Sequence, residues 1–216
     1  MKHEKFHYKQ LDELQAKLNE LDVTLPLSEN MDVLHREVQI GSKTCANSIA
    51  IQPMEGCDGT ADGCPDALTL RRYDRFARSG AEAVAGVEEG RANPRQLWLH
   101  EENLAAFQKF VADIKETCMK ENGFEPVVIM QATHSGRYSK PHGTPAPLIA
   151  YNNPIFEGDN PIPADRILSD DYLMALEEKF GEAAKLAERA GFDGVDIKCC
   201  HRYLNSELLS AYTRKG

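Results

Sequence analysis

The feature that most constrains this sequence is a regular alternation of short apolar strand signals and amphipathic helix signals. Strand signals lie near residues 49, 83, 127 and 193, and a helical pattern separates each pair. Such an order predicts parallel strands joined by right-handed helical crossovers. The sequence therefore predicts an α/β fold. Periodicity alone is equally consistent with a closed barrel and with an open doubly wound sheet.

The helices are predicted by their apolar faces and by their ends. Three amphipathic segments are each followed by a glycine, which favours the left-handed C-cap conformation. They are residues 67–77 before Gly80, residues 104–118 before Gly123, and residues 173–187, which follow the N-cap Ser169 and precede Gly191. An earlier helix over Leu11–Leu21 is assigned no chemistry. We therefore expect an N-terminal helical extension over residues 1–38 and the main domain over residues 39–216.

Charge and cysteine content exclude several classes of protein. The net charge is 25 − 34 = −9, which argues against a nucleic-acid-binding surface. No apolar run approaches the length of a membrane span, and the first residues do not resemble a secretory signal. Six irregularly spaced cysteines indicate reduced thiols and a cytoplasmic protein. Cys57 and Cys64 are compatible with a metal site, but a plain glycine-rich loop is the alternative.

Polar residues follow the predicted strands instead of preceding them. The clusters are Gln52–Glu55, Glu82–Ala83, Gln131 with His134 and Arg137, and Lys198 with His201 and Tyr203. In barrels and in open sheets alike, ligands bind at this carboxyl edge. Residues 138–168 hold six prolines and are expected to form a lid over it.

Four segments resemble the Old Yellow Enzyme family of FMN-dependent NAD(P)H:flavin oxidoreductases, including its dienoyl-CoA-reductase-like members. They are Asn47–Met54, Glu88–Leu97 (EEGRANPRQL), Gln131–Arg137 (QATHSGR) and Ala190–Thr213. The resemblance runs from about residue 40 to residue 216. It implies a (β/α)8 TIM barrel of which only about the first four βα units are present, with FMN as cofactor and NAD(P)H as electron donor.

The resemblance also implies which residues contact the flavin. Gln131 matches the glutamine that bonds the pyrimidine edge, and one amide offers both a donor and an acceptor for that purpose. Pro53, Met54 and Ala83 match positions that line the ring. For Pro53 and Met54, packing of a strand end on the core is the alternative.

The turn after the last strand is expected to handle substrate. By resemblance, Lys198 and His201 would hold the oxygen of an activated alkene or enoyl compound, and Tyr203 would deliver the proton. The family usually has a histidine at the position of Lys198, and a lysine there would favour acidic or acyl-type substrates. A lysine whose tip reaches solvent is the alternative. His134 and Arg137 are compatible with ligand contacts and equally with structural roles.

Two departures from the family pattern carry further expectations. The second strand is clipped, because Gly80-Ala81 runs directly into Glu82-Ala83, and the resemblance ends before the family's phosphate site. A half barrel would expose two sheet edges, so a homo-oligomer through those edges is expected. The alternatives to a truncated oxidoreductase are a non-catalytic half-barrel acting as an interaction module, and a metal-dependent enzyme using His134, Lys198 and His201.

Overall fold

The centre of the molecule is a parallel sheet of three strands. A computed structural model of the chain describes residues 4–78, 83–86 and 88–215. Strands β3 (Ala83–Gly86), β4 (Ile129–Thr133) and β5 (Gly194–Ile197) lie side by side in that order, and both pairings are parallel. The predicted strands near residues 83, 127 and 193 are therefore confirmed in position and direction.

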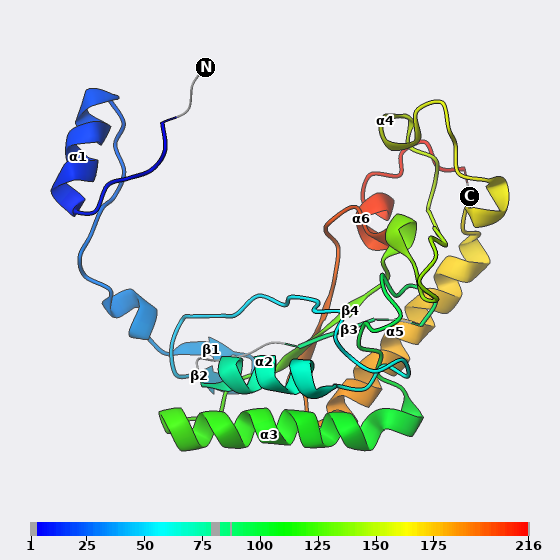
Figure 1. Ribbon diagram of the computed structural model, residues 1–216, viewed down its shortest axis with the longest axis horizontal. Helices are drawn as coiled ribbons and strands as arrows, with labels where there is room; N and C mark the ends of the chain where they lie inside the picture. The colour runs from blue at the N-terminus through cyan, green and yellow to red at the C-terminus, as the bar shows by residue number, and fades with distance from the viewer. Residues whose placement is uncertain (1–3, 79–82, 87, 216) are drawn as a thin grey trace.

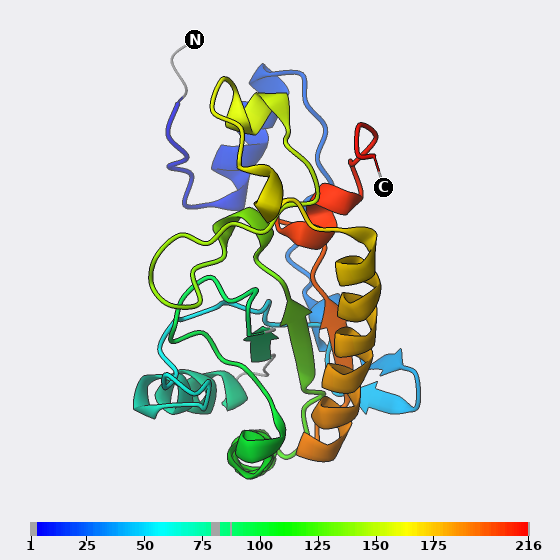
Figure 2. The same ribbon diagram turned by 90° about the vertical axis from the view of Figure 1, so that its right-hand side faces the viewer.

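Three helices pack against one face of this sheet. Helices α2 (Ala67–Ala77), α3 (Leu104–Asn122) and α5 (Asp170–Ala190) bury their apolar sides in one core with β4 (Figure 2). The core joins Tyr73 of α2, Phe107 of α3, Met130 of β4 and Ala187 of α5. A doubly wound sheet would carry helices on both faces. Strands in sequential order with helices on one face are the arrangement of an α/β barrel.

Side chains of β4 alternate between the two faces of the sheet. Met130 and Ala132 are buried against the helices. Because successive side chains of a strand point to opposite faces, Ile129, Gln131 and Thr133 project to the other face, which is the inner face of a barrel. The same alternation and the parallel register place Asp196 of β5 on that inner face beside Gln131.

The expected first strand at residues 48–52 is wrong. Strands β1 (Val38–Ile40) and β2 (Lys43–Cys45) instead form an antiparallel hairpin that the sequence did not predict. Residues 46–66 contain no helix or strand. A strand needs a neighbour that offers free backbone groups. That neighbour would be β3, which is only 4 residues long, consistent with the clipped second strand expected from the sequence.

The helix ends follow the predicted signals. Gly123 and Gly191 adopt the left-handed conformation after α3 and α5, and the Ser169 hydroxyl accepts a hydrogen bond from the backbone N–H of Tyr172 at the start of α5. Helix α2 ends at Ala77 with Arg78 as its C-cap. The predicted cap at Gly80 lies outside the described residues.

The proline-rich segment 138–168 is packed in place. It includes the short helix α4 (Pro154–Glu157) and shares a second apolar core with α5 and α6 (Leu204–Leu208). Arg137 anchors this segment, because its buried guanidinium pairs with Glu157 of α4 and with Glu207 of α6. The structural alternative for Arg137, an ion pair with a nearby carboxylate, is thus what the structure contains.

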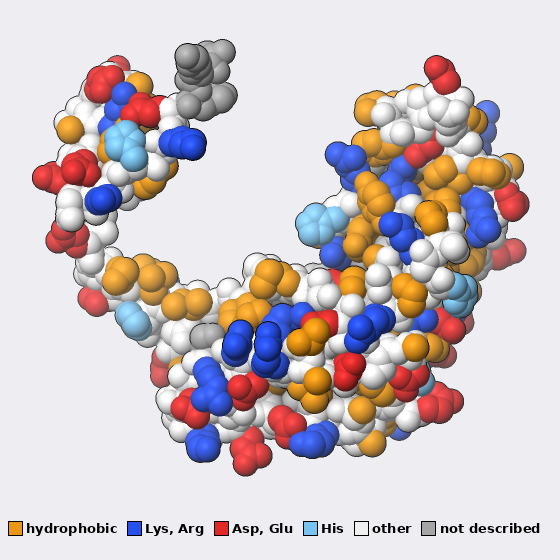
Figure 3. Space-filling model, in the orientation of Figure 1, with side chains coloured by type: hydrophobic (Ala, Val, Ile, Leu, Met, Phe, Trp, Pro, Cys, Tyr) orange, Lys and Arg blue, Asp and Glu red, His pale blue; other side chains and the backbone are white. Residues whose placement is uncertain are grey.

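The N-terminal helix α1 (Leu11–Glu20) lies on an arm that stands away from the sheet and its helices (Figure 1). A hollow separates this arm from the lobe formed by α4 and α6 (Figure 3). In the part of the chain that the structure describes, every helix is too short or too polar to span a lipid bilayer.

The strands β3 and β5 are the two edges of this sheet, and β5 is the edge on the side of the last strand. On β5, Val195 and Ile197 are each 38% exposed. An exposed strand edge invites pairing with another chain. The expected homo-oligomer through this edge stays a prediction.

Candidate active site

The segments that follow β4 and β5 run together at the carboxyl end of the sheet. The backbone N–H of Lys198 donates to the carbonyl oxygen of Ala132 at 3.0 Å, and the N–H of Leu204 donates to that of His134 at 3.2 Å. The turn over residues 198–203 is therefore fixed against the end of β4. Tyr203 and the β4 residue Gln131 therefore both lie toward the carboxyl end of the sheet, as the sequence predicts.

The turn over residues 198–203 has an unusual backbone. His201 and Arg202 both adopt left-handed conformations, with φ of 59° and 58°. Non-glycine residues rarely take this conformation, and it persists where the surroundings impose it. The turn closes through a 3.1 Å hydrogen bond from the N–H of Tyr203 to the carbonyl oxygen of Cys200, and Tyr203 then caps the N-terminus of α6.

Three predicted catalytic side chains meet in this turn. The Lys198 ammonium lies 4.5 Å from the centroid of the Tyr203 ring, and the rings of His201 and Tyr203 are 6.2 Å apart and edge to face. A cation over an aromatic face is attracted by the electron-rich ring. The lysine therefore packs on the phenol instead of extending alone into solvent.

The Tyr203 phenol is half-buried, and its environment favours the protonated form. Burial raises the pKa of Tyr203, and the nearby Cys57, Glu55 and Cys200 add to the increase, whereas the Ser135 hydroxyl opposes it. A phenol whose pKa is raised keeps its proton at neutral pH. Such a group can donate a proton to a bound molecule but does not act as a base.

Glu55 is a titratable residue of this region that the sequence did not assign to the site. Burial raises the pKa of its carboxyl to about 7, opposed by the N–H of Cys57 and by the charges of Arg72 and Lys198. Its position beside Met54 in a predicted strand-end cluster was the only sequence signal. What makes it notable is burial by separate parts of the chain, which sequence alone does not reveal.

Gln131 is buried on the inner face, where its side chain is oriented by a carboxylate. Its Nε2 donates to Oδ2 of Asp196 at 2.6 Å, which leaves the amide oxygen as an acceptor. Two residues on, the buried Oγ1 of Thr133 has no hydrogen-bond partner among the described residues. A polar heterocycle edge needs such donors and acceptors, so these inner-face groups fit the pyrimidine edge of a flavin.

The remaining predicted flavin contacts are not all brought to this edge. Pro53 is half-buried, and Met54 is 56% exposed in the loop that also carries Glu55. Ala83 is the first residue of β3 and pairs with Met130, whereas Gly86 pairs with Thr133. Ala83 thus lies at the amino end of its strand and not at the carboxyl edge, contrary to the predicted strand end at Glu82–Ala83.

His134 is a structural residue. Its ring is buried, its Nδ1 accepts the N–H of Gly136 at 3.1 Å, and its Nε2 lies 3.1 Å from the Tyr172 hydroxyl. Burial lowers the pKa of His134 to about 4, so the ring is neutral near pH 7.

The metal-site alternatives find no support in the geometry. Over residues 4–78 and 88–215, no three histidine, cysteine or acidic side chains gather as a metal would require. Cys57 and Cys64 are both free, and Cys64 contacts Asp62 within the same loop.

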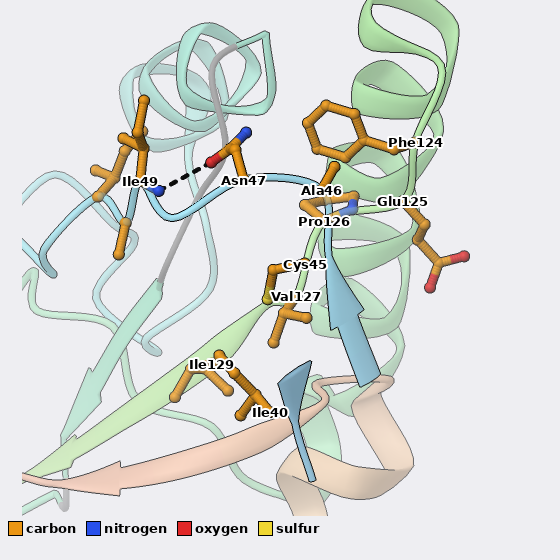
Figure 4. Close-up of a pocket in the computed structure, with 12 residues that line it drawn as sticks. Ile40, Cys45, Ala46, Asn47, Ile49, Phe124, Glu125, Pro126, Val127 and Ile129 are labelled. Atoms are coloured by element: carbon orange, nitrogen blue, oxygen red, sulfur yellow. Dashed lines mark hydrogen bonds between the residues drawn. The ribbon is translucent and has the colours of Figure 1, made fainter. Parts of the chain in front are cut away.

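An apolar pocket lies at the opposite end of β4. It is lined by Ile40 and Cys45 of the hairpin, by the loop around Ile49, and by residues from Phe124 to Ile129 (Figure 4). The hairpin thus closes the amino end of the sheet, where it is remote from the turn that carries Tyr203.

Comparison with known proteins places this chain in a family. The sequence model of the NADH:flavin oxidoreductase / NADH oxidase family matches residues 34–215. An NADH oxidase from Thermoanaerobacter brockii is 25% identical over 191 residues, which cover 84% of this chain and 28% of that protein. The chain therefore spans less than a third of the length of this relative.

Solved structures with low sequence identity share the fold. A 2-naphthoyl-CoA reductase complex has a TM-score of 0.70 at 18% identity, covering 86% of this chain and 30% of that one. The old yellow enzyme from Trypanosoma cruzi has a TM-score of 0.62 at 23% identity, covering 80% of this chain and 52% of that one. The fold is accordingly part of an α/β barrel of the Old Yellow Enzyme type. With its family model matched from residue 34 to residue 215, the chain belongs to the NADH:flavin oxidoreductase / NADH oxidase family.

Proposed function

We propose that this chain is part of an FMN-dependent oxidoreductase that uses NAD(P)H to reduce an electron-poor alkene. The observation that carries the proposal is the meeting of Lys198, His201 and a protonated Tyr203 at the carboxyl end of a family barrel. A cation and a neutral phenol that lie together suit a substrate whose oxygen gains negative charge while a neighbouring carbon takes up a proton.

The proposed cofactor contacts are those of the inner face. Gln131 would present its amide to the polar edge of FMN, oriented by Asp196, and Thr133 would offer a hydroxyl that has no partner among the described residues. Pro53 and Met54 remain proposed contacts from the loop that carries Glu55. When bound, the flavin supplies hydride chemistry that side chains lack.

The side chains of this chain perform the acid–base and electrostatic work. Lys198 and His201 hold the substrate oxygen and stabilise the negative charge that develops on it. Tyr203 donates its phenolic proton to the substrate carbon beside the carbonyl. The high pKa of the phenol keeps that proton available across the neutral pH range.

A non-catalytic interaction module is not favoured. The family of this chain is one of flavin oxidoreductases, and its polar residues gather at the edge where barrel enzymes bind ligands. A chain that acted only through its exposed strand edges would not need a half-buried lysine and phenol at the carboxyl end of the sheet.

Flavin binding by the purified chain tests the first part of the proposal. FMN fluorescence is titrated with the wild type and with two variants, Gln131→Leu and the matched exposed-site control Gln15→Leu. We expect quenching by the wild type and the control, and weaker binding by Gln131→Leu. Absence of quenching at any concentration of wild type would contradict the proposed cofactor.

Turnover tests the proposed proton donor. We expect cyclohex-2-enone to stimulate NAD(P)H oxidation by the FMN-loaded chain under anaerobic conditions. In Tyr203→Phe the stimulated rate should fall by about a hundredfold, since general acid catalysis contributes roughly 10²–10⁴. FMN binding by this variant should match the wild type. An unchanged rate would remove Tyr203 from the mechanism.

A further inference from the structure

Two adjacent free cysteines lie in the turn that carries the proposed catalytic side chains. Cys199 and Cys200 are both exposed, whereas Cys118 is buried and the remaining three cysteines are half-buried. The reaction proposed above uses neither of the exposed thiols. Both are accessible to reagents in solution, so a difference in reactivity between the two neighbours must come from what each one faces.

The two thiols have different surroundings. Sγ of Cys199 donates to the carbonyl oxygen of Ile197 at 3.4 Å, so this thiol is directed back toward β5. The carbonyl oxygen of Cys200 instead accepts the N–H of Tyr203 at 3.1 Å across the turn. Burial is the main cause of the raised pKa of the Tyr203 phenol, and the Cys200 side chain adds to it. Cys200 is therefore the cysteine that lies beside the proposed proton donor.

A buried hydroxyl next to this turn lacks a partner. Ser135 follows β4 and is fully buried, and its Oγ makes no hydrogen bond within the described residues. Burial raises the pKa of the Tyr203 phenol and the Ser135 hydroxyl opposes that rise, so the two side chains lie close together. A buried hydroxyl without a partner is costly unless another molecule supplies one. It is an independent sign that a ligand oxygen belongs on the side of the turn where Tyr203 and Cys200 lie.

The substrates proposed above are also electrophiles toward thiols. A cation that holds the carbonyl oxygen of a conjugated alkene draws electron density from the β-carbon, which then accepts a nucleophile more readily. Hydride is the nucleophile in the proposed reduction, and a thiolate attacks the same carbon. Lys198 and His201, which would hold the oxygen, flank the two cysteines in the sequence. An alkene bound there is therefore presented to a thiol whether or not hydride is available.

We propose that Cys200 is a covalent modification site for alkenes conjugated to a carbonyl group, directed by the same turn that would hold them for reduction. The thiol of Cys200 loses its proton to water, and its sulfur bonds to the β-carbon while the carbon–carbon π bond breaks. The neighbouring carbon takes the phenolic proton of Tyr203, which water then restores. The net change is addition of S–H across the double bond, so no oxidant or reductant is consumed. This inference rests on the substrate class proposed above and gives that substrate a second fate.

Labelling of the full chain with two reagents tests the proposal. Cyclohex-2-enone is added without NAD(P)H, and iodoacetamide, which alkylates thiols by displacement and has no double bond to activate, is added to a second sample. Trypsin cleaves after Lys198 and Arg202, and tandem mass spectrometry of the released peptide assigns the label to either cysteine. We expect the enone to modify Cys200 about tenfold faster than Cys199, the effect of one hydrogen bond to a charged oxygen, and iodoacetamide to modify both at similar rates. Equal rates with the enone, or the same preference with iodoacetamide, would overturn the proposal.

Variants separate activation of the alkene from reactivity of the thiol itself. Lys198→Met should slow the modification of Cys200 by cyclohex-2-enone about tenfold and leave its rate with iodoacetamide unchanged. The matched control Lys120→Met, at an exposed position of α3, should behave as the wild type with both reagents. A parallel decrease with iodoacetamide would place the effect of Lys198 on the thiol instead of the alkene and would overturn the proposal. Cys118, which is buried in the core, stays unlabelled in any variant that folds.

The outcomes remain decisive if Lys198→Met fails to fold, because the wild-type rates with the two reagents then decide the proposal alone. FMN binding and NAD(P)H-dependent reduction of cyclohex-2-enone are measured on the same protein. Selective modification of Cys200 without flavin binding or reduction would reject the proposed function and leave the modification site. Reduction of the enone without a preference for Cys200 would reject only the modification site.

Discussion

The side chain of Gln131 on the central strand β4 donates a 2.6 Å hydrogen bond to Oδ2 of Asp196 on the edge strand β5. The two residues are also direct neighbours in the parallel ladder. This bond orients the amide on the inner face. One N–H of Nε2 is engaged by the carboxylate, so the amide oxygen and the second N–H remain for a bound ring.

Removing that carboxylate should weaken flavin binding. In Asp196→Ala the amide loses its orienting partner, and we expect an FMN Kd about tenfold higher, equivalent to about 1.4 kcal/mol for one charge-assisted hydrogen bond. FMN fluorescence quenching measures the change. Asp159→Ala, an exposed aspartate of the proline-rich segment, is the control and should bind FMN as the wild type does. Equal affinity in Asp196→Ala would mean that the Gln131 amide is oriented without its neighbour.

The buried ion pair between Arg137 and Glu207 should dominate the stability of the proline-rich segment. Glu207 accepts from Nε of Arg137 at 2.8 Å and from the N–H of Ala150 at 2.9 Å, and the paired side chains are 7% and 3% exposed. Replacing Glu207 leaves Arg137 paired with Glu157 but removes the acceptor of its Nε and of the buried N–H of Ala150, at a cost of about 1–3 kcal/mol for each donor left unsatisfied.

Urea denaturation and limited proteolysis measure this effect. Glu207→Ala should lower the unfolding midpoint and open residues 138–168 to cleavage. The exposed-site control Glu178→Ala should change stability by less than about 0.5 kcal/mol. If Glu207→Ala resists protease as the wild type does, the apolar contacts of the segment hold it without the ion pair.

The buried His134 should make the protein less stable in mild acid. Its pKa is lowered to about 4 in the folded state from 6.5, so the unfolded chain binds the proton more tightly. Stability from this group is fully present above pH 6.5 and is lost as the pH falls toward 4. The loss reaches about 3 kcal/mol, at 1.36 kcal/mol per pKa unit.

Urea midpoints between pH 7 and pH 4.5 test the contribution of His134. His134→Asn, whose amide oxygen can accept the Gly136 N–H in place of Nδ1, should show a shallower acid-induced decrease than the wild type. His35→Asn, at an exposed position, should keep the wild-type slope. Parallel slopes in all three proteins would show that His134 does not contribute to the acid sensitivity.

Two glycines in the left-handed conformation allow a matched test of the close contact between Gly136 and the start of α6. Gly136 has φ of +57°, and a Cβ there would lie 2.7 Å from the backbone nitrogen of Leu204. Gly123 has φ of +79° with nothing within 4 Å of the same position. Gly123→Ala should cost only the conformational penalty, about 1–2 kcal/mol. Gly136→Ala should lower the Tm considerably more, because α6 must also shift. Similar Tm decreases would show that α6 accommodates the methyl group.

The helices were predictable because their information is local. The apolar spacing of residues 104–118 and the glycine at position 123 fix where α3 lies and where it ends, whatever surrounds it. The strand expected near Ile49 shows the opposite case. Its apolar pattern suits a strand, but a strand forms only when a neighbouring strand can pair with it. The neighbour would be β3, which is short, and the residues around Ile49 carry no information about the length of β3.

The candidate site divides in the same way. Lys198, His201 and Tyr203 were found from their motif after a predicted strand, and Gln131 from the strand before it. Glu55 was not assigned, because a carboxyl in a loop is ordinary until other segments bury it. Ala83 was expected at a strand end and is the first residue of β3, where it pairs with Met130.

The sequence by itself determined the α/β class, the family, the helices and the residue types at the carboxyl edge, because each depends on short patterns that survive without a partner. Tertiary structure alone decided that the helices share one face of the sheet, that residues 46–66 form no strand, and that the Glu55 carboxyl is buried. Burial and strand pairing are properties of two or more distant segments, so they are absent from any single stretch of sequence.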